Sequence, residues 1–217
     1  MIIYSDAADI MAEQVRETGL PEELCPILNR LNYSRRGWLK RNVHEQNTVE
    51  SALQHTAKLA LAASAVNPEK WGLNSLALRQ QCIVHEIPEI LGTDWMPGEI
   101  SLAEKARLEE QQMLEILPKE FPERQKILDI WTDFETQHGL AFFLDKMDAA
   151  VTADYYAVVD RKYVPVAEEF HQYACSKVQD ETLRRILKTV HVGSLATRRK
   201  LAPTDVFPFY FEQLAGC

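Results

Sequence analysis

The sequence has few of the residues that mark strands, disulfides or membrane spans. Glycine accounts for only 8 of its 217 residues, and the alternation of polar and apolar residues that is typical of strands is nearly absent. Its 4 cysteines show neither C-x-x-C spacing nor a pairing pattern, so no disulfide framework is indicated. No run approaches about eighteen consecutive apolar residues, which argues against a membrane-spanning helix. The N-terminus lacks the basic and apolar regions of a signal peptide. We therefore expect a reduced, cytoplasmic protein.

Positive charge is also scarce. The chain has 24 Lys and Arg against 32 Asp and Glu, which gives a net charge of -8. Such a chain is not expected to bind polymeric nucleic acid or membrane surfaces, because both attract basic patches. A small anionic substrate stays open as a partner, since a few local arginines and lysines can oppose the global charge. The most basic stretch, residues 33–47, is on its pattern alone more typical of a solvated connector than of a site.

Helix signals, in contrast, are plentiful. A capping box at Ser101 and Glu104 opens one helix, and apolar residues recur at helical spacing in others. The predicted helices cover about residues 5–19, 21–31, 47–66, 74–91, 101–116, 122–137, 140–159, 163–176, 180–190 and 204–215. We therefore expect an all-α fold of about eight to ten helices. The expected organisation is a single domain over residues 1–217, with its core at about 30–160 and helices 5–33 and 163–215 packed on it.

Residues 82–94 contain the most notable group of titratable side chains in the sequence. Titratable side chains lie there among apolar neighbours, where they have a desolvation cost unless something compensates it. A bound divalent cation is one compensation, because imidazole and carboxylates are its ligands; a solvated charged helix face is the alternative. We expect this stretch to be helical as far as Gly92, with Pro88 as an interior kink. A zincin is excluded, because position 89 is not a second histidine. The titratable residues are His85, Glu86, Glu89 and Asp94.

Two residues on other predicted helices complete a candidate metal site. His55 lies on the helix at 47–66 and Asp148 on the helix at 140–159. A lone histidine on a helix rich in Ala and Leu is more often a core residue than a ligand. Together with His85 and Glu86, however, these residues would supply two imidazoles and two carboxylates. Such a site suits Mn, Fe, Co or Ni, with Zn and Mg as less distinctive fits, so we expect one divalent metal ion as cofactor.

Five blocks of the sequence, taken in order, support a family resemblance. They are Arg35-Arg-Gly-Trp38 followed by Glu50-Ser-Ala-Leu-Gln-His55; His85-Glu-Ile-Pro-Glu89 with Asp94; Glu104-Lys105-x-Arg107-x-Glu109-Glu110; Asp133-Phe-Glu135; and Asp145-Lys-Met-Asp148 with Tyr155-Tyr156. From about residue 20 to the C-terminus, the chain resembles the HD-domain phosphohydrolase superfamily, and most of all its compact branch of HD-domain 5'-deoxynucleotidases. The resemblance implies an all-α HD-type bundle and a metal-dependent hydrolase of phosphomonoesters.

The resemblance also implies roles for the matched residues. Glu89 and Asp94 would position or deprotonate the attacking water and handle the leaving oxygen, and Trp38 would pack against the nucleoside sugar. The phosphate would meet one of three arginines and Lys105. The arginines are Arg35, Arg36 and Arg41. The implied metal ligands are His55, His85, Glu86 and Asp148.

One departure from the family pattern leaves three hypotheses open. The defining aspartate of the family is Glu86 in this chain. The first hypothesis is an enzyme that removes the 5'-phosphate of (deoxy)nucleoside monophosphates. The second is an iron-dependent HD-type oxygenase, whose sites usually hold two metals. The third is a protein with an altered site that binds a nucleotide without turnover. The partner in the first and third is a small phosphorylated molecule, and a homodimer stays open.

Overall fold

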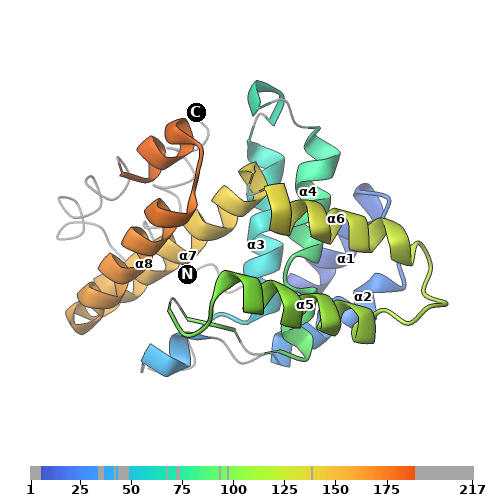
Figure 1. Cartoon of the computed structure of the whole chain (residues 1–217), viewed down its shortest axis with the longest axis horizontal. Helices are drawn as coiled ribbons and strands as arrows, with labels where there is room; N and C mark the ends of the chain where they lie inside the picture. The colour runs from blue at the N-terminus through green and yellow to red at the C-terminus, as the bar shows by residue number, and fades with distance from the viewer. Residues whose placement is uncertain are drawn as a thin grey trace.

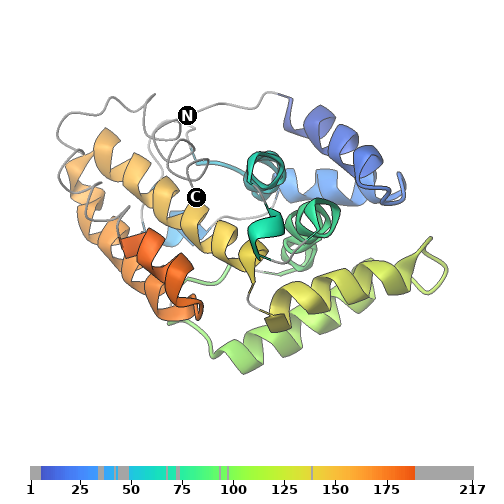
Figure 2. The same ribbon diagram turned by 90° about the horizontal axis from the view of Figure 1, so that it is seen from above.

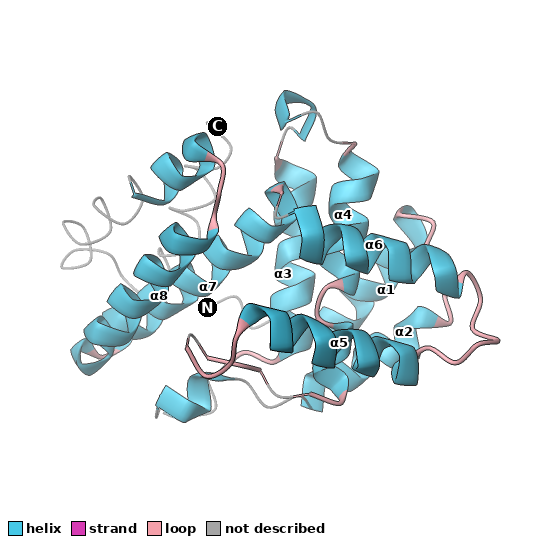
Figure 3. Cartoon of the chain, in the orientation of Figure 1, coloured by secondary structure: helices cyan, strands magenta, loops and turns pink. Residues whose placement is uncertain are grey.

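The computed structural model shows helices over most of the residues that it describes. The described residues are 6–33, 37–41, 43, 49–66, 68–71, 74–92, 94–96, 98–137 and 139–188. Within them no strand occurs, as Figure 3 shows. This confirms the all-α class that the sequence predicts. The α-helices are α1 (Ala7–Glu17), α2 (Leu24–Leu28), α3 (Ala52–Ala65), α4 (Ser75–Val84), α5 (Leu102–Ile116), α6 (Arg124–Gln137), α7 (Leu140–Val159) and α8 (Val164–Lys177). A further helical stretch covers 181–188.

Short 3-10 helices lie between several of these elements. They are η1 (Asn29–Tyr33), η2 (Gly37–Arg41), η3 (Pro68–Trp71), η4 (Ile87–Ile90) and η5 (Arg161–Tyr163). Figure 1 shows α7 and α8 as a packed pair at one end of the molecule. In the second view, α3 and α4 lie between this pair and the group formed by α1, α2, α5 and α6 (Figure 2). The central pair α3 and α4 therefore contacts helices on both sides.

Helix α3 contributes to two apolar clusters. Ala57 and Ala60 belong to a cluster with α1, α2, α4, α5 and α6, whereas Leu59 and Ala63 belong to a cluster built mainly from α7 and α8. The small side chains of α3 allow neighbouring helices to approach closely. A polar residue on this helix is consequently buried from both sides, and this is the environment of His55, which is 1% exposed.

Two helix boundaries differ from the predicted ones. Helix α3 begins later than expected, because Ser51 is the N-cap and forms a capping box with Gln54. Helix α4 ends at Val84 instead of continuing with a kink. Pro88 has no N–H to give to the carbonyl of Val84, and its ring would meet that carbonyl. The chain therefore leaves the helix just where the His85–Glu86 pair occurs.

Some predicted features lie outside the described residues. These are the last predicted helix (204–215), most of the basic stretch, and both Arg35 and Arg36. Among the described helices, none combines the length and the apolar character that a membrane crossing needs. The thiols of Cys25, Cys82 and Cys175 are free.

Candidate metal centre

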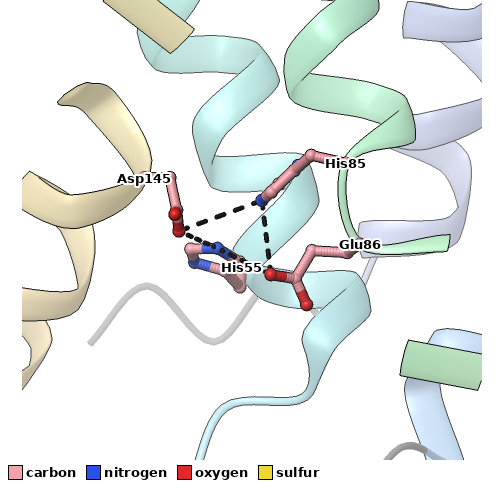
Figure 4. A group of neighbouring side chains, drawn as sticks. All are labelled: His55, His85, Glu86 and Asp145. Carbon is pink, nitrogen blue, oxygen red and sulfur yellow. Dashed lines mark ion pairs between the residues drawn. The ribbon is translucent and has the colours of Figure 1, made fainter. Parts of the chain in front are cut away.

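Four buried side chains from three regions of the chain meet beside α3. His55 comes from α3, His85 and Glu86 follow the end of α4, and Asp145 comes from α7, as Figure 4 shows. One atom from each residue lies within 4.8 Å of the corresponding atom in the other three. His85 and Glu86 lie between the end of α4 and the start of η4, and there both side chains reach the same point. The sequence alone did not establish this.

The distances within this cluster are those of groups that surround one ion. His85 Nε2 is 3.3 Å from Glu86 Oε1, and His55 Nε2 is 3.3 Å from Asp145 Oδ1. The two remaining nitrogen–oxygen separations are 3.6 Å and 3.9 Å. Ligands about 2.1 Å from one metal are about 3.0–3.4 Å apart at octahedral or tetrahedral angles. The cluster is thus slightly wider than a metal-bound shell.

Both imidazoles present Nε2 to the cluster. The Nδ1 of His85 lies 2.9 Å from the carbonyl oxygen of Cys82, to which it donates, and the Nδ1 of His55 lies 2.8 Å from Asp148 Oδ2. Among the described residues, neither buried Nε2 has a hydrogen-bond partner. Two oriented imidazole nitrogens without partners, beside two carboxylate oxygens, fit a divalent ion.

The position of Asp148 differs from the expected one. Asp145 and Asp148 are three residues apart on α7, so both face α3. The His55 ring lies between them, with Nε2 3.3 Å from Asp145 and Nδ1 2.8 Å from Asp148. Asp148 therefore contacts the nitrogen that points away from the cluster, and Asp145 occupies the position for which Asp148 was predicted.

Charges within the cluster shift the pKa values of its members. Burial lowers the pKa of His55, but the carboxylates of Asp145 and Asp148 on either side of the ring outweigh it and raise that pKa to about 10. Burial raises the pKa of Asp145, yet Lys146 and the two imidazoles hold it well below its usual value. In the metal-free chain, protons and lysines therefore neutralise the carboxylates.

A cavity of about 500 Å³ opens beside the four residues. It is lined by most of the residues to which the family resemblance assigns chemistry, and by residues to which the sequence analysis assigned no role. From the first set it includes Trp38, Glu89, Asp94 and Lys105; from the second, Phe134, Phe142, Lys146, Phe170, Tyr173 and Lys177. The missed residues sit on α6, α7 and α8. Their role as cavity walls follows only from how these helices pack.

The loop around Asp94 is attached to η2. The amide of Gly37 donates to Asp94 Oδ2 at 2.7 Å, and Lys40 Nζ donates to the carbonyl oxygen of Asp94 at 3.0 Å. Lys40 also pairs with Glu99 at 2.6 Å. A methyl group on Gly37 would collide with Met96 and would lie 3.2 Å from Asp94 Oδ2. A side chain at position 37 would therefore crowd both Met96 and the Asp94 carboxylate.

Trp38 is part of an aromatic group between η2 and the pair formed by α7 and α8. Its ring stacks on Phe170 at a centroid distance of 4.4 Å and meets the edge of Tyr156 at 5.3 Å. The side chain is only 2% exposed. It therefore forms a fixed wall of the cavity.

Two half-buried lysines bring positive charge to the cavity. Burial lowers the pKa of Lys105, but Glu109, Glu135 and Glu89 together raise it; its Nζ lies 2.5 Å from Glu109. Lys146 Nζ lies 2.6 Å from Asp145 Oδ2, on the side of that carboxylate away from the histidines. The side chain of Arg41 is not described.

The HD domain family model matches residues 28–191 of this chain. The chain is therefore a member of the HD domain family, as its helical fold and its His/Glu/Asp cluster also indicate. Among curated proteins, it is 29% identical over 119 residues to the 5'-deoxynucleotidase HDDC2 of Homo sapiens, with 52% of this chain and 55% of that protein covered. For the Danio rerio protein of the same name the identity is 28% over 134 residues, covering 59% and 64%.

The Mus musculus protein of this name gives 29% identity over 119 residues, with 52% of the chain and 56% of that protein covered. This chain thus spans between 55% and 64% of the length of these curated relatives. The matches support the family resemblance inferred from the five sequence blocks. The name 5'-deoxynucleotidase describes the activity of those relatives.

Proposed function

We propose that this protein is a metal-dependent phosphohydrolase that removes the 5'-phosphate from (deoxy)nucleoside monophosphates. The observation that carries the proposal is the cluster of two imidazoles and two carboxylates at one end of a cavity. His55, His85, Glu86 and Asp145 are the proposed ligands. Membership of the HD domain family and the similarity to proteins named 5'-deoxynucleotidase support the same reaction class.

The donor set fits a divalent ion such as Mn, Co, Fe, Ni, Zn or Mg. Imidazole and carboxylate ligands suit these ions, and the remaining coordination positions would face the cavity. When bound, such an ion supplies a Lewis acid for a phosphoryl oxygen and lowers the pKa of a coordinated water. The chain's own residues must then hold the phosphate, orient the water and move the proton.

Glu89 and Asp94 are the proposed carboxylates for the water and for the leaving oxygen. Both line the same cavity as the cluster. The Gly37 amide donates to Asp94 Oδ2 and thereby fixes the orientation of the Asp94 carboxylate at the cavity. In the reaction, water oxygen forms the new bond to phosphorus and the bond from phosphorus to O5' breaks. The proton taken from water by one carboxylate ends on the nucleoside oxygen.

The cavity has the chemical character expected for a nucleotide. Its volume, about 500 Å³, lies in the range typical of small-molecule sites. Trp38 and Phe170 provide aromatic surface against which a sugar or base can pack. Lys146, beside Asp145, and Lys105 are the described cations for phosphoryl oxygens. Arginines 35, 36 and 41 remain part of the proposal from the family resemblance.

The position of the Glu86 carboxylate bears on whether the protein hydrolyses a nucleotide or only binds it. Its carboxylate reaches within 3.3 Å of His85 Nε2 and 3.6 Å of His55 Nε2. The longer side chain is accommodated, because the local backbone lies in a turn between α4 and η4. This favours a competent metal site over the alternative in which the chain binds a nucleotide without hydrolysing it.

The test is phosphate release from a panel of nucleoside and deoxynucleoside 5'-monophosphates, measured with each divalent metal in turn. We expect release that requires added metal and disappears in Asp145→Asn. The control is Asp129→Asn, which makes the same chemical change on the exposed surface of α6. Folded, metal-loaded protein that releases no phosphate from any member of the panel would overturn the proposal. Tight nucleotide binding by that same protein would favour the binding-only alternative.

A further inference from the structure

A second pair of carboxylates, one buried and one half-buried, lies on the opposite side of His55. Glu50, just before the N-cap of α3, and Asp148 on α7 approach His55 closely enough for the three to hold a cation. Lys58 supplies that cation: its Nζ is 2.8 Å from Glu50 Oε2 and 2.9 Å from Asp148 Oδ1. The ammonium also donates to Thr152 Oγ1 at 3.1 Å. This group is therefore neutralised from within the chain.

Burying the ammonium group of Lys58 has a desolvation cost. The residue is 6% exposed, and lysine is almost never buried to this degree unless it is paired. Apolar side chains of similar volume often stabilise a core as well as, or better than, a buried ion pair. The contacts of Asp148 give the ion pair between Lys58 and Asp148 a functional reason.

Asp148 connects Lys58 to a proposed metal ligand. One of its oxygens contacts the ammonium, and the other accepts from His55 Nδ1 at 2.8 Å. Lys58 and His55 are three residues apart on α3, so both meet the same carboxylate on α7. A carboxylate that holds the Nδ1 proton of a histidine fixes its tautomer and its ring orientation, and leaves Nε2 available for a metal.

We propose that Lys58 is a positioning residue of the metal centre. It holds Asp148, and through Asp148 it holds the His55 ring with Nε2 directed at Glu86 and Asp145. The inference rests on the proposed metal site and deepens it. The position of Lys58 also sets the metal stoichiometry. Because the Lys58 ammonium occupies the site between Glu50 and Asp148, the chain binds one divalent ion around His55 and not two. That argues against the two-metal, iron-dependent oxygenase hypothesis.

The test is metal affinity in Lys58→Met, which removes the charge and keeps most of the side-chain length. Metal-free protein is titrated with Mn²⁺ or Zn²⁺ in competition with a chelator, and the bound ions are counted by elemental analysis. We expect the Kd to rise about ten- to a hundredfold, the usual effect of removing a partner of a metal ligand. Lys58→Arg, which keeps the charge, should recover much of that loss. Wild-type protein should saturate at one ion per chain.

Asp148→Asn provides a second route to the same answer and serves if Lys58→Met does not fold. It should weaken metal binding too, and the double variant should lose less than the product of the two single effects, because both act through one path. The matched control is Asp154→Asn. Asp154 is also on α7 and is bonded to a buried histidine, His171, at 2.9 Å, but it is not a member of either group of candidate ligands around His55.

Each outcome has a separate meaning. A metal Kd within twofold of wild type in folded Lys58→Met or Asp148→Asn overturns the positioning role, even if the melting temperature falls. An equal loss of affinity in Asp154→Asn would also overturn it, since the effect would then be general destabilisation. Wild-type protein that binds no metal would instead overturn the proposed metal site itself.

Discussion

Replacing Glu86 by Asp restores the residue that the HD family resemblance leads one to expect, yet we predict that it weakens metal binding. The carboxylate of Glu86 lies 3.3 Å from His85 Nε2 and 3.6 Å from His55 Nε2. The substitution withdraws it by one carbon–carbon bond, about 1.5 Å. Metal–ligand distances tolerate only about 0.2 Å, so the shortened side chain would leave the ion with three protein ligands.

The size of the effect follows from the number of ligands. Structural sites with four ligands bind Zn²⁺ with about 10–16 kcal/mol, which is about 3 kcal/mol for each ligand if it is shared equally. A loss of about 3 kcal/mol corresponds to a Kd about a hundredfold higher. Backbone adjustment between α4 and η4 would reduce this value, which is therefore an upper estimate.

The assay is chelator competition with purified Glu86→Asp, followed by phosphate release at saturating metal. Glu109→Asp is the matched control, because Glu109 is a buried glutamate of the same cavity that pairs with Lys105 and lies outside the four-residue cluster. A Glu86→Asp protein that binds metal more tightly than wild type and releases phosphate faster would refute the reasoning. Glu86 would then be a defect of the site rather than an accommodated ligand.

Three further predictions follow from the geometry. Gly37→Ala should lower kcat/KM several-fold with metal content unchanged, because the added methyl would lie 3.2 Å from Asp94 Oδ2 and shift that carboxylate slightly. Gly139→Ala, where a methyl meets nothing within 4 Å, should behave as wild type, and equal activity of both variants would contradict the role of Gly37. Lys146→Met should raise KM and leave the metal content nearly unchanged, and Lys146→Arg should partly restore KM. Steady-state assays on metal-saturated protein measure both effects. An unchanged KM in Lys146→Met would show that Lys146 does not bind the phosphate. The raised pKa of His55, about 10 in the metal-free chain, predicts that metal uptake near neutral pH releases a proton and that affinity increases as pH rises toward that value. Titration calorimetry in two buffers of different ionisation enthalpy measures this release, and its absence would contradict the assignment of His55 as a ligand.

The pH dependence of stability in the metal-free protein follows from the same shift. The folded-state pKa of His55 lies above the ordinary value of 6.5. The protonated imidazole therefore contributes stability that is fully present below about pH 6.5, and this contribution is lost as pH rises through about 10. Metal binding replaces the proton, so the metal-bound protein should lack this loss at high pH.

Much of the helical fold could be predicted from the sequence because its signals are local. The N-cap Ser101, whose side chain accepts from the Glu104 amide, and the apolar face of the following residues fix α5. The start of α3 was predicted too early, at residue 47, whereas Ser51 and Gln54 form the actual cap. The boundaries of a helix are the part of a local prediction that is least well determined.

The region around His85 shows how a wrong local prediction can still lead to the right residues. A kinked helix through Pro88 was expected, but α4 ends at Val84 and η4 follows. On a continuous helix, adjacent residues point about 100° apart, and sharing of one ion by His85 and Glu86 would then be difficult. The break in the helix removes this conflict. It brings both side chains to the cluster.

The choice between Asp145 and Asp148 marks the limit of local reasoning. Both aspartates lie on one face of α7, both contact His55, and both carry a depressed pKa because cations next to them outweigh the opposing effect of burial. What separates them is the orientation of one imidazole ring, which is set by contacts between α3 and α7. Lys58 approaches one carboxylate and leaves the other to face His85. Lys58 is not a ligand, yet its pairing with Asp148 leaves Asp145 as the aspartate that faces the metal site. The Lys58 variants therefore test the arrangement of the site while all four proposed ligands are kept.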